Sequence, residues 1–140
     1  AILEVLNKTT NTLKEKNITI VGTGILVGKP TAIMLMNKEA TVTTCNEFTT
    51  NLKQKCLQAD IIISGVGKKY LIKKDMVPQN SIIIDVGVSY EGKDIYGDIQ
   101  KENIKNKVSA FTPTTGGIGP ITVAKLFENV VKANETIAAS

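Results

Sequence analysis

ITIVGTGILVGKP, from Ile18 to Pro30, is an apolar run that breaks into three glycines and ends on a proline. Gly22, Gly24 and Gly28 have no Cβ, which suits a tight turn and a close approach of the backbone to a ligand. Pro30 suits the first turn of a helix, where a missing N–H costs nothing. Because the free N–H groups at the start of that helix favour anions, the stretch predicts a strand, turn and helix that bind a nucleotide phosphate.

The spacing of these glycines departs from the common dinucleotide fingerprint, G-x-G-x-x-G. The last gap holds Ile25, Leu26 and Val27, one residue more than the fingerprint allows. The motif by itself therefore does not establish nucleotide binding.

Short β-branched runs alternate with helical stretches along the chain. The expected strands are residues 18–21, 41–45, 61–64, 82–86 and 108–112. The expected helices are residues 2–13, 31–37, 52–58 and 121–133, with a shorter piece at 101–106. The runs ITIV, IIIS and IIIDV are apolar without alternation, as in a parallel sheet covered by helices on both faces. We predict a single α/β domain with a doubly wound, mostly parallel, Rossmann-like sheet.

The last expected helix carries an apolar stripe. Val123, Phe127, Val130 and Val131 recur at helical spacing. We expect this stripe to face the core.

Composition restricts the chemistry of this 140-residue chain, whose net charge is +4. It has no histidine and all 17 basic residues are lysines, which excludes Ser-His-Asp triads, His-ligated metals and bidentate arginine clamps. Cys45 and Cys56 lack CxxC spacing, so we expect buried thiols in a cytoplasmic protein, with the mitochondrial matrix or another organelle as the alternative. No apolar stretch approaches the roughly 20 residues of a membrane span, so neither a membrane segment nor a signal peptide is expected.

Four lysines, at positions 68, 69, 73 and 74, flank Tyr70. An RNA-binding patch would interleave such charges with aromatic residues, which make up only 4% of the chain. We interpret these lysines as a solvated face and expect no nucleic-acid partner.

Glycines follow four of the five expected strands, at the edge where a doubly wound sheet binds its ligands. The segments after the third, fourth and fifth strands are SGVG (64–67), DVG (85–87) and TPTTGGIGPIT (112–122). Any one of these glycines is explained as a plain turn. Their recurrence favours backbone contact with a bound molecule.

Glu47 stands close after the second expected strand. An acidic residue at this place accepts hydrogen bonds from the ribose hydroxyls of adenosine and repels the 2′-phosphate of NADP. The alternative is a surface glutamate in the loop 46–51.

The chain resembles the cofactor-binding domain of the bifunctional methylenetetrahydrofolate dehydrogenase/methenyltetrahydrofolate cyclohydrolase family. The family loop G-R-S-x-x-V-G-x-P is matched by residues 22–30, which accounts for the extra residue between the glycines. The motifs A-T-V-T, A-D-I-x-I-S-x-V-G, I-D-V-G and G-D-V are matched at residues 40–43, 59–67, 84–87 and 97–99. T-P-V-P-G-G-V-G-P-M-T is matched at residues 112–122, and the motifs occur in order over nearly the whole chain.

The resemblance implies an enzyme that oxidises 5,10-methylenetetrahydrofolate by hydride transfer to NAD or NADP and hydrolyses the methenyl product to 10-formyltetrahydrofolate. It also implies a homodimer, and a preceding domain with the folate pocket and the lysine and tyrosine that serve the chemistry. We expect residues 1–15 to be part of an interdomain linking helix, 16–134 the NAD(P)-binding domain and 135–140 a C-terminal tail. No catalytic residue is expected in this chain, and the isolated chain is expected to be inactive.

The resemblance also assigns cofactor-binding residues by position. Those implied to hold the pyrophosphate and adenosine are Gly22, Thr23, Gly24, Ile25 and the helix start after Gly28. Those implied to line the ribose are Ser64, Gly65 and Val66. Those implied to lie near the nicotinamide are Val86, Gly87, Gly117, Ile118 and Thr122. The loop on the substrate side is implied to contain Pro113 and Gly116.

Four departures from the family pattern stand out, one of them a pair of residues. Thr23 replaces an arginine that helps to hold the 2′-phosphate in NADP-dependent members, and Asn46-Glu47 replaces an H-S or H-R pair. Thr115 replaces the second proline of P-V-P-G-G, which frees a backbone φ, and Lys69 replaces the proline of V-G-K-P. Relative to the family pattern, the changes at Thr23 and Asn46-Glu47 remove positive charge and add a negative charge. We therefore predict a preference for NAD, or weakened cofactor binding.

Two other functions stay open at this point. The chain could be the nucleotide domain of an amino-acid or shikimate-type dehydrogenase, although the segment 112–122 argues against this. It could also be a non-catalytic nucleotide-binding or dimerisation module, an alternative that the four departures keep open.

Overall fold

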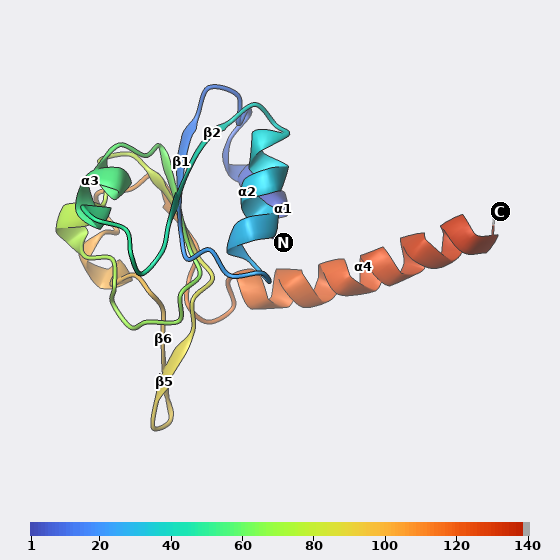
Figure 1. Ribbon diagram of the computed structural model, residues 1–140. Helices are drawn as coiled ribbons and strands as arrows, with labels where there is room; N and C mark the ends of the chain where they lie inside the picture. Colours follow the sequence, from blue (N-terminus) through green and yellow to red (C-terminus); the bar gives the residue numbers. More distant parts are fainter. Residues whose placement is uncertain (139–140) are drawn as a thin grey trace.

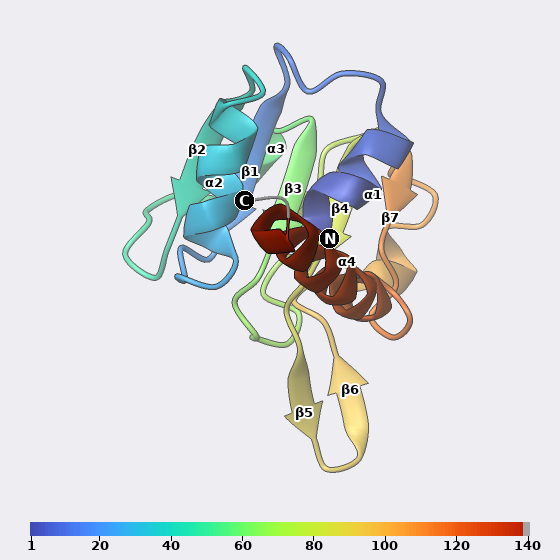
Figure 2. The same ribbon diagram turned by 90° about the vertical axis from the view of Figure 1, so that its right-hand side faces the viewer.

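A five-stranded parallel sheet, in the order β2-β1-β3-β4-β7, forms the centre of the molecule (Figure 2). The computed structural model describes residues 1–138. The strands of the sheet are β1 (Asn17–Val21), β2 (Thr41–Cys45), β3 (Ile61–Ser64), β4 (Ile82–Asp85) and β7 (Ala110–Phe111). Ile20 pairs with Ile63, which pairs with Ile84, so the inner strands align isoleucines across the sheet. These β-branched runs suit strands that are covered on both faces.

Helices cover both faces of the sheet (Figure 1). The helices on one face are α1 (Ile2–Thr9) and α2 (Gly28–Met36), and those on the other are α3 (Leu52–Leu57) and the one-turn helices η1 (Lys74–Met76) and η2 (Lys101–Asn103). Because successive strand residues point to opposite faces, two cores result. Ile62 packs in the cluster that includes Cys56 of α3, and Ile63 packs with Leu6 of α1 and Leu35 of α2.

The predicted fold class is confirmed, and the five expected strands all form. Their ends shift slightly, since β4 stops at Asp85 and β7 is reduced to Ala110–Phe111. Helix α1 ends at Thr9 rather than at residue 13, because Thr10 takes an extended conformation. Helix α2 begins at Gly28, before the expected residue 31.

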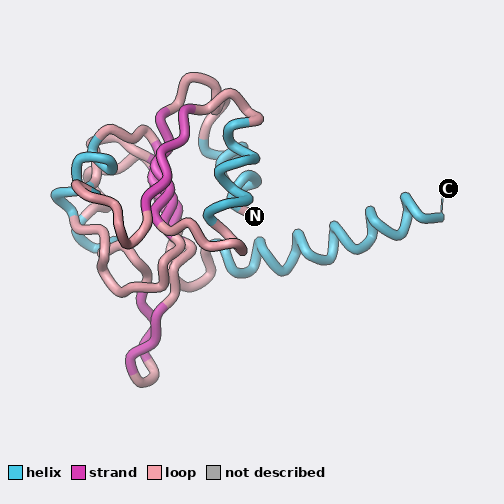
Figure 3. Tube along the Cα trace, in the orientation of Figure 1, coloured by secondary structure: helices cyan, strands magenta, loops and turns pink. Residues whose placement is uncertain are grey.

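Two segments project from this body (Figures 1 and 3). The first is an antiparallel hairpin of β5 (Ser89–Glu91) and β6 (Asp94–Tyr96), which was not predicted. The second is α4 (Ile118–Ala138), which begins three residues before the expected helix and continues past residue 133. The expected tail is thus helical as far as Ala138, and residues 139–140 lie outside the described part of the chain.

The apolar stripe of α4 does not face the core, so that prediction was wrong. Val123, Phe127, Val130 and Val131 are between 55% and 67% exposed. The helix leaves the body after Ile118, and its Lys125 reaches back to Glu4 of α1 in an ion pair with an Nζ–Oε2 distance of 3.0 Å. The helical period was read correctly, but nothing within residues 1–138 covers the stripe. Among those residues, no helix has both the length and the apolar character needed to cross a bilayer.

Candidate functional site

A cleft of about 500 Å³ opens where the order of the strands reverses. Strand β1 is flanked by β2 on one side and β3 on the other, and doubly wound sheets bind ligands at such a point, beyond the carboxyl ends of the strands. Six of the predicted site residues line this cleft: Gly22, Thr23, Gly24, Glu47, Gly65 and Val66. The structure therefore brings together three segments that are far apart in the sequence.

The backbone of this cleft is packed too closely for side chains at two glycines. A Cβ on Gly28, at the start of α2, would lie 1.9 Å from the carbonyl oxygen of Gly22. A Cβ on Gly22 would lie 2.7 Å from the carbonyl oxygen of Gly65, and Gly22 has a φ of +101°, which side chains disfavour. The absence of a side chain at Gly28 thus lets α2 pack against the turn at Gly22. That turn lies directly beside the loop after β3.

The loop after β2 holds Glu47 at the rim of the cleft. The Asn46 side-chain oxygen accepts a hydrogen bond from the N–H of Phe48 at 3.0 Å, and the Asn46 N–H donates to the Thr49 hydroxyl at 2.8 Å. Such turns fix short polar loops. The carboxylate of Glu47 is exposed and free to meet a ligand from solvent.

The prediction missed other residues that line the cleft: Val21, Asn46, Thr49, Leu52, Lys68 and Leu71. Lys68 matters most for charge, because it lines the same cleft as Glu47 and is the only lysine among the lining residues that the structure describes. The run of lysines around Tyr70 contained this signal, but the sequence alone did not show which lysine faces the cleft. The apolar side chains of Leu52 and Leu71 offer a surface on which a base can pack.

A second, smaller cavity of about 260 Å³ lies between the starts of α1, α2 and α4. Three of the predicted residues line it, namely Val86, Ile118 and Thr122. Leu26, Val27 and Pro30 from the glycine-rich segment line it too. The segment 18–30 therefore borders both cavities, one on each side.

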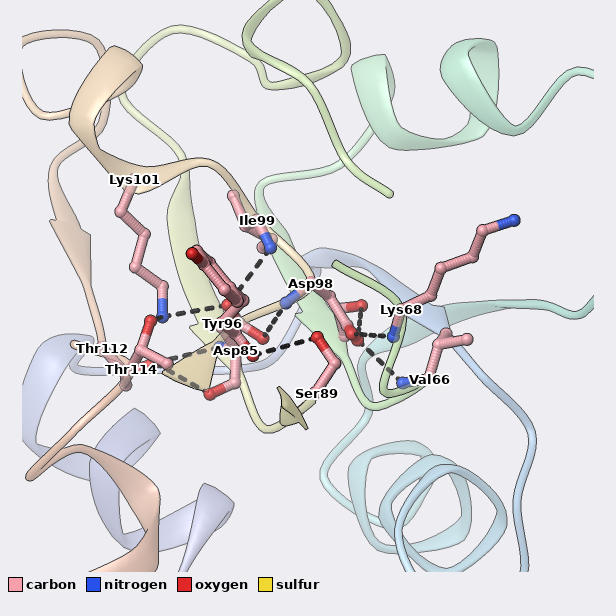
Figure 4. A network of polar contacts seen from close by, with 11 residues as sticks. Val66, Lys68, Asp85, Ser89, Tyr96, Asp98, Ile99, Lys101, Thr112 and Thr114 are labelled. Carbon is pink, nitrogen blue, oxygen red and sulfur yellow. Dashed lines mark hydrogen bonds and ion pairs between the residues drawn. The ribbon is translucent and has the colours of Figure 1, made fainter. Parts of the chain in front are cut away.

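The side chain of Asp98 holds the loop after β3 in place (Figure 4). Its carboxylate accepts hydrogen bonds from the Ser64 hydroxyl at 2.6 Å and from the N–H groups of Val66 and Lys68, both at 2.8 Å. Ser64 is fully buried, so its hydroxyl is directed to Asp98 rather than into the cleft. A Cβ on Gly87 would lie 2.1 Å from the same carboxylate, so Gly87 makes room for it.

Asp85 forms a second buried centre, next to Asp98 (Figure 4). Its carboxylate accepts hydrogen bonds from the N–H groups of Asp98 and Ile99, both at 3.2 Å, and pairs with the Lys101 ammonium at 2.9 Å. Burial raises the pKa of Asp85, while the hydrogen bond and the charge of Lys101 act against that rise. Sequence reasoning did not single out either member of this pair.

The loop after β7 lies outside both cavities. Pro113 and Gly116 are exposed and line neither of them, and the same holds for Ile25, which is 79% exposed. Gly116 has a φ of +71°, and a Cβ on the buried Gly117 would lie 2.1 Å from the Pro113 carbonyl oxygen. Both glycines are thus required for the tight turn that leads into α4.

The geometry of the two cavities suits a dinucleotide. The larger cleft offers apolar side chains, a carboxylate and a close-packed glycine turn, while the smaller cavity is largely apolar. These are the features that doubly wound domains use for the adenosine, ribose and pyrophosphate of a nicotinamide cofactor.

Comparison with known proteins agrees with this geometry. Residues 1–138 match the family described as tetrahydrofolate dehydrogenase/cyclohydrolase, NAD(P)-binding domain. The bifunctional protein FolD of Methanosarcina barkeri is 46% identical over 124 residues, which cover 89% of this chain and 43% of that protein. The chain thus spans less than half the length of this relative.

Two solved structures share the fold. The bifunctional methylenetetrahydrofolate dehydrogenase/cyclohydrolase FolD of Campylobacter jejuni superposes with a TM-score of 0.92 at 38% identity, over 96% of this chain and 48% of that one. The Trypanosoma brucei enzyme, solved with NADP and an inhibitor, gives a TM-score of 0.93 over 99% of this chain and 50% of that one. At 24% identity, the second likeness concerns the fold alone. The chain belongs to the tetrahydrofolate dehydrogenase/cyclohydrolase family, and it represents the NAD(P)-binding domain of that family.

Proposed function

We propose that this chain is the cofactor half of an enzyme that oxidises 5,10-methylenetetrahydrofolate and hydrolyses the methenyl product to 10-formyltetrahydrofolate. The observation that carries the proposal is the cleft between β1, β2 and β3, built on a glycine turn too tight for side chains, in a chain that matches the family domain over residues 1–138. The nicotinamide cofactor would supply the hydride acceptor. The chain's own residues bind and orient that cofactor.

For the site residues we propose the roles that the family resemblance implies, supported by the cavities that some of them line. Residues 22–24, together with the α2 start at Gly28, would hold the pyrophosphate, with the neighbouring, exposed Ile25 as a further contact. Gly65 and Val66 would line the ribose, with Ser64 positioning their loop through Asp98. The residues toward the nicotinamide would be Val86, Gly87, Gly117, Ile118 and Thr122. Pro113 and Gly116 would face the folate.

The charges of the cleft support a preference for NAD over NADP. Glu47 at the rim would accept hydrogen bonds from a free 2′-hydroxyl and repel a 2′-phosphate. Thr23 offers no positive charge, since it stands where the family pattern has arginine. Lys68 would oppose this trend, because it is a positively charged residue among those that line the same cleft. Lysine forms a single charged contact where arginine forms a fork, so Lys68 is the weaker phosphate ligand.

We further propose that folate binding and the chemistry reside mainly in a preceding domain. The chain spans 43% of the Methanosarcina barkeri relative, which leaves room for such a domain. The exposed stripe of α4 and the adjacent α1, joined through Lys125 and Glu4, offer it an apolar surface. We therefore expect the chain alone to bind cofactor without turning over folate.

A homodimer is the assembly we propose, with the hairpin β5–β6 as its contact. Tyr90 and Ile95 on this hairpin are 71% and 42% exposed. Lys69 fixes its base, because the ammonium lies 3.5 Å from the centroid of the Tyr96 ring and pairs with Glu91. Sedimentation velocity of the chain is expected to show a dimer, and the variant Tyr90→Glu is expected to shift it to monomer. A monomeric wild type would contradict this assembly.

Both buried cysteines are free thiols. Free thiols are typical of proteins in reducing compartments, and we therefore propose that this protein is located in the cytoplasm.

The proposed activity is tested by NADH formation from 5,10-methylenetetrahydrofolate. The assay compares the larger protein that contains this chain with the 140-residue chain alone. We expect turnover from the larger protein and none from the chain. Absence of folate-dependent reduction with both NAD and NADP in the larger protein would contradict the dehydrogenase and favour a non-catalytic nucleotide-binding module. Turnover by the chain alone would contradict the placement of the chemistry in another domain.

A further inference from the structure

Lys101 is a buried lysine that the proposed cofactor site does not use. Its side chain is 6% exposed, and its ammonium lies 2.9 Å from a carboxylate oxygen of Asp85, whose side chain is fully buried (Figure 4). The same ammonium donates a hydrogen bond to the Thr114 hydroxyl at 2.7 Å. Burying a charged side chain is unfavourable unless its partners are well placed. The two partners of Lys101 come from different segments, β4 and the loop after β7.

The Asp85 end of this link is rigid. Asp85 is the last residue of the inner strand β4. Its carboxylate accepts hydrogen bonds from the backbone N–H groups of residues 98 and 99, and its own backbone N–H donates a hydrogen bond to the Thr112 hydroxyl at 2.9 Å. A Cβ on Gly97 would lie 2.1 Å from the Asp85 carboxylate and 3.1 Å from the Lys101 ammonium. The chain is thus shaped to let Lys101 reach Asp85.

The Thr114 end of the link belongs to the loop 112–117, which lacks a restraint that the family pattern contains. In the pattern T-P-V-P-G-G the residues at positions 114 and 115 are valine and proline, whereas this chain has two threonines. Proline fixes φ, so its replacement frees the backbone just before Gly116 and Gly117. Both glycines depend on this backbone geometry, because Gly116 has a φ of +71° and a Cβ on Gly117 would lie 2.1 Å from the Pro113 carbonyl oxygen.

We propose that Lys101 is a positioning residue, which ties the loop 112–117 to the end of β4 through Thr114 and replaces the restraint of the missing proline. The hydroxyl of Thr114 supplies a hydrogen-bond acceptor where the pattern has a purely apolar side chain. The loop leads directly into Ile118, which lines the smaller cavity. The consequence for folate binding rests on the function proposed above, but the ordering of the loop does not.

Backbone order parameters of Gly116 and Gly117, measured by NMR on the 140-residue chain, test the proposal. Thr114→Val is the deciding variant, because it breaks the link and leaves the Asp85–Lys101 ion pair in place. In this variant we expect the backbone order parameters of both glycines to fall from about 0.85, the value of a rigid backbone, to below about 0.6. Thr115→Val is the matched control and should leave the order parameters of both glycines unchanged. Thr114→Val/Thr115→Pro, which restores the family proline, should return the order.

Unchanged order in Thr114→Val, an equal loss in Thr115→Val, or a loss that proline does not reverse would each overturn the proposal. In the larger enzyme, Thr114→Val is expected to raise KM for the folate substrate roughly tenfold with little change in kcat, because a looser loop binds less tightly. The added proline should restore KM. A wild-type enzyme without folate-dependent activity would contradict the proposed function, while the order parameters still decide the role of Lys101.

Discussion

Asp98 illustrates how one side chain can set the shape of a site that it does not line. Its carboxylate accepts hydrogen bonds from Ser64, Val66 and Lys68, which fixes the loop forming one wall of the cleft. The side chain is fully buried, so an unpaired N–H left behind by its loss would have no water to replace it. Gly87 completes the arrangement by leaving space for the carboxylate.

Replacing Asp98 with asparagine is therefore expected to destabilise the fold. The amide group keeps the size of the carboxylate but turns one acceptor into a donor, which then faces backbone N–H groups. Hydrogen bonds to charged groups contribute about 1.5–3 kcal/mol, and we expect the free energy of unfolding in urea to fall by about that amount. Glu102→Gln, at an exposed carboxylate nearby, is the control and should change it by less than about 0.5 kcal/mol. Equal effects of the two substitutions would contradict this role of Asp98.

The two cysteines give a prediction about pH. Burial raises the pKa of both thiols, that of Cys56 to about 12. Because the folded pKa is raised, this thiol favours the folded state below its unfolded pKa of about 8.5, and the contribution is lost as pH rises toward 12. At a pH of about 9 we expect slow alkylation of the folded chain and rapid alkylation of two thiols after unfolding in urea. Rapid alkylation of the folded chain would show that Cys56 is accessible and ionised.

At the scale of elements, α2 and α4 behave as opposites. Leu35 of α2 is fully buried against the sheet, whereas Phe127 of α4 is 67% exposed. Both residues lie on apolar helices, and the difference comes from what covers each helix. The sheet covers α2, while α4 runs away from the body (Figure 1).

Alanine at these two positions should therefore have very different effects on the chain. Leu35→Ala leaves a cavity and is expected to lower the free energy of unfolding by about 2–5 kcal/mol. Phe127→Ala removes an exposed side chain and should change it by less than about 0.5 kcal/mol. Urea unfolding of the two variants, followed by circular dichroism, measures both values. A large loss in Phe127→Ala would mean that α4 packs on the body in solution.

The strands were predictable because their apolar, β-branched runs are bounded by glycines and polar turns, as at residues 61–64. The hairpin β5–β6 escaped prediction because its strands have three residues each and carry little apolar pattern. The stripe of α4 was placed on the core because helical period shows that a face is apolar and not what it contacts. Burial of Phe127 would need a partner that residues 1–138 do not include.

At the scale of the whole molecule, the place of the site was predictable and its charges were not. Parallel topology puts the ends of β1, β2 and β3 at one edge, so Gly22, Glu47 and Gly65 were expected to meet there, and they do. Lys68 and Lys101 were missed because lysines are numerous and their long side chains reach in directions that spacing does not reveal. The pairing of Asp85 with Lys101 needs a contact between segments that only the folded chain shows.

The central claim is that the cleft at this edge binds NAD in preference to NADP. Isothermal titration of the 140-residue chain with each dinucleotide tests it directly, since both Glu47 and the glycine turn of the cleft belong to this chain. We expect NAD to bind at least about tenfold more tightly, because Glu47 would repel the added phosphate, and we expect Glu47→Ser to reduce that ratio. Tighter binding of NADP, or no binding of either dinucleotide, would contradict the account.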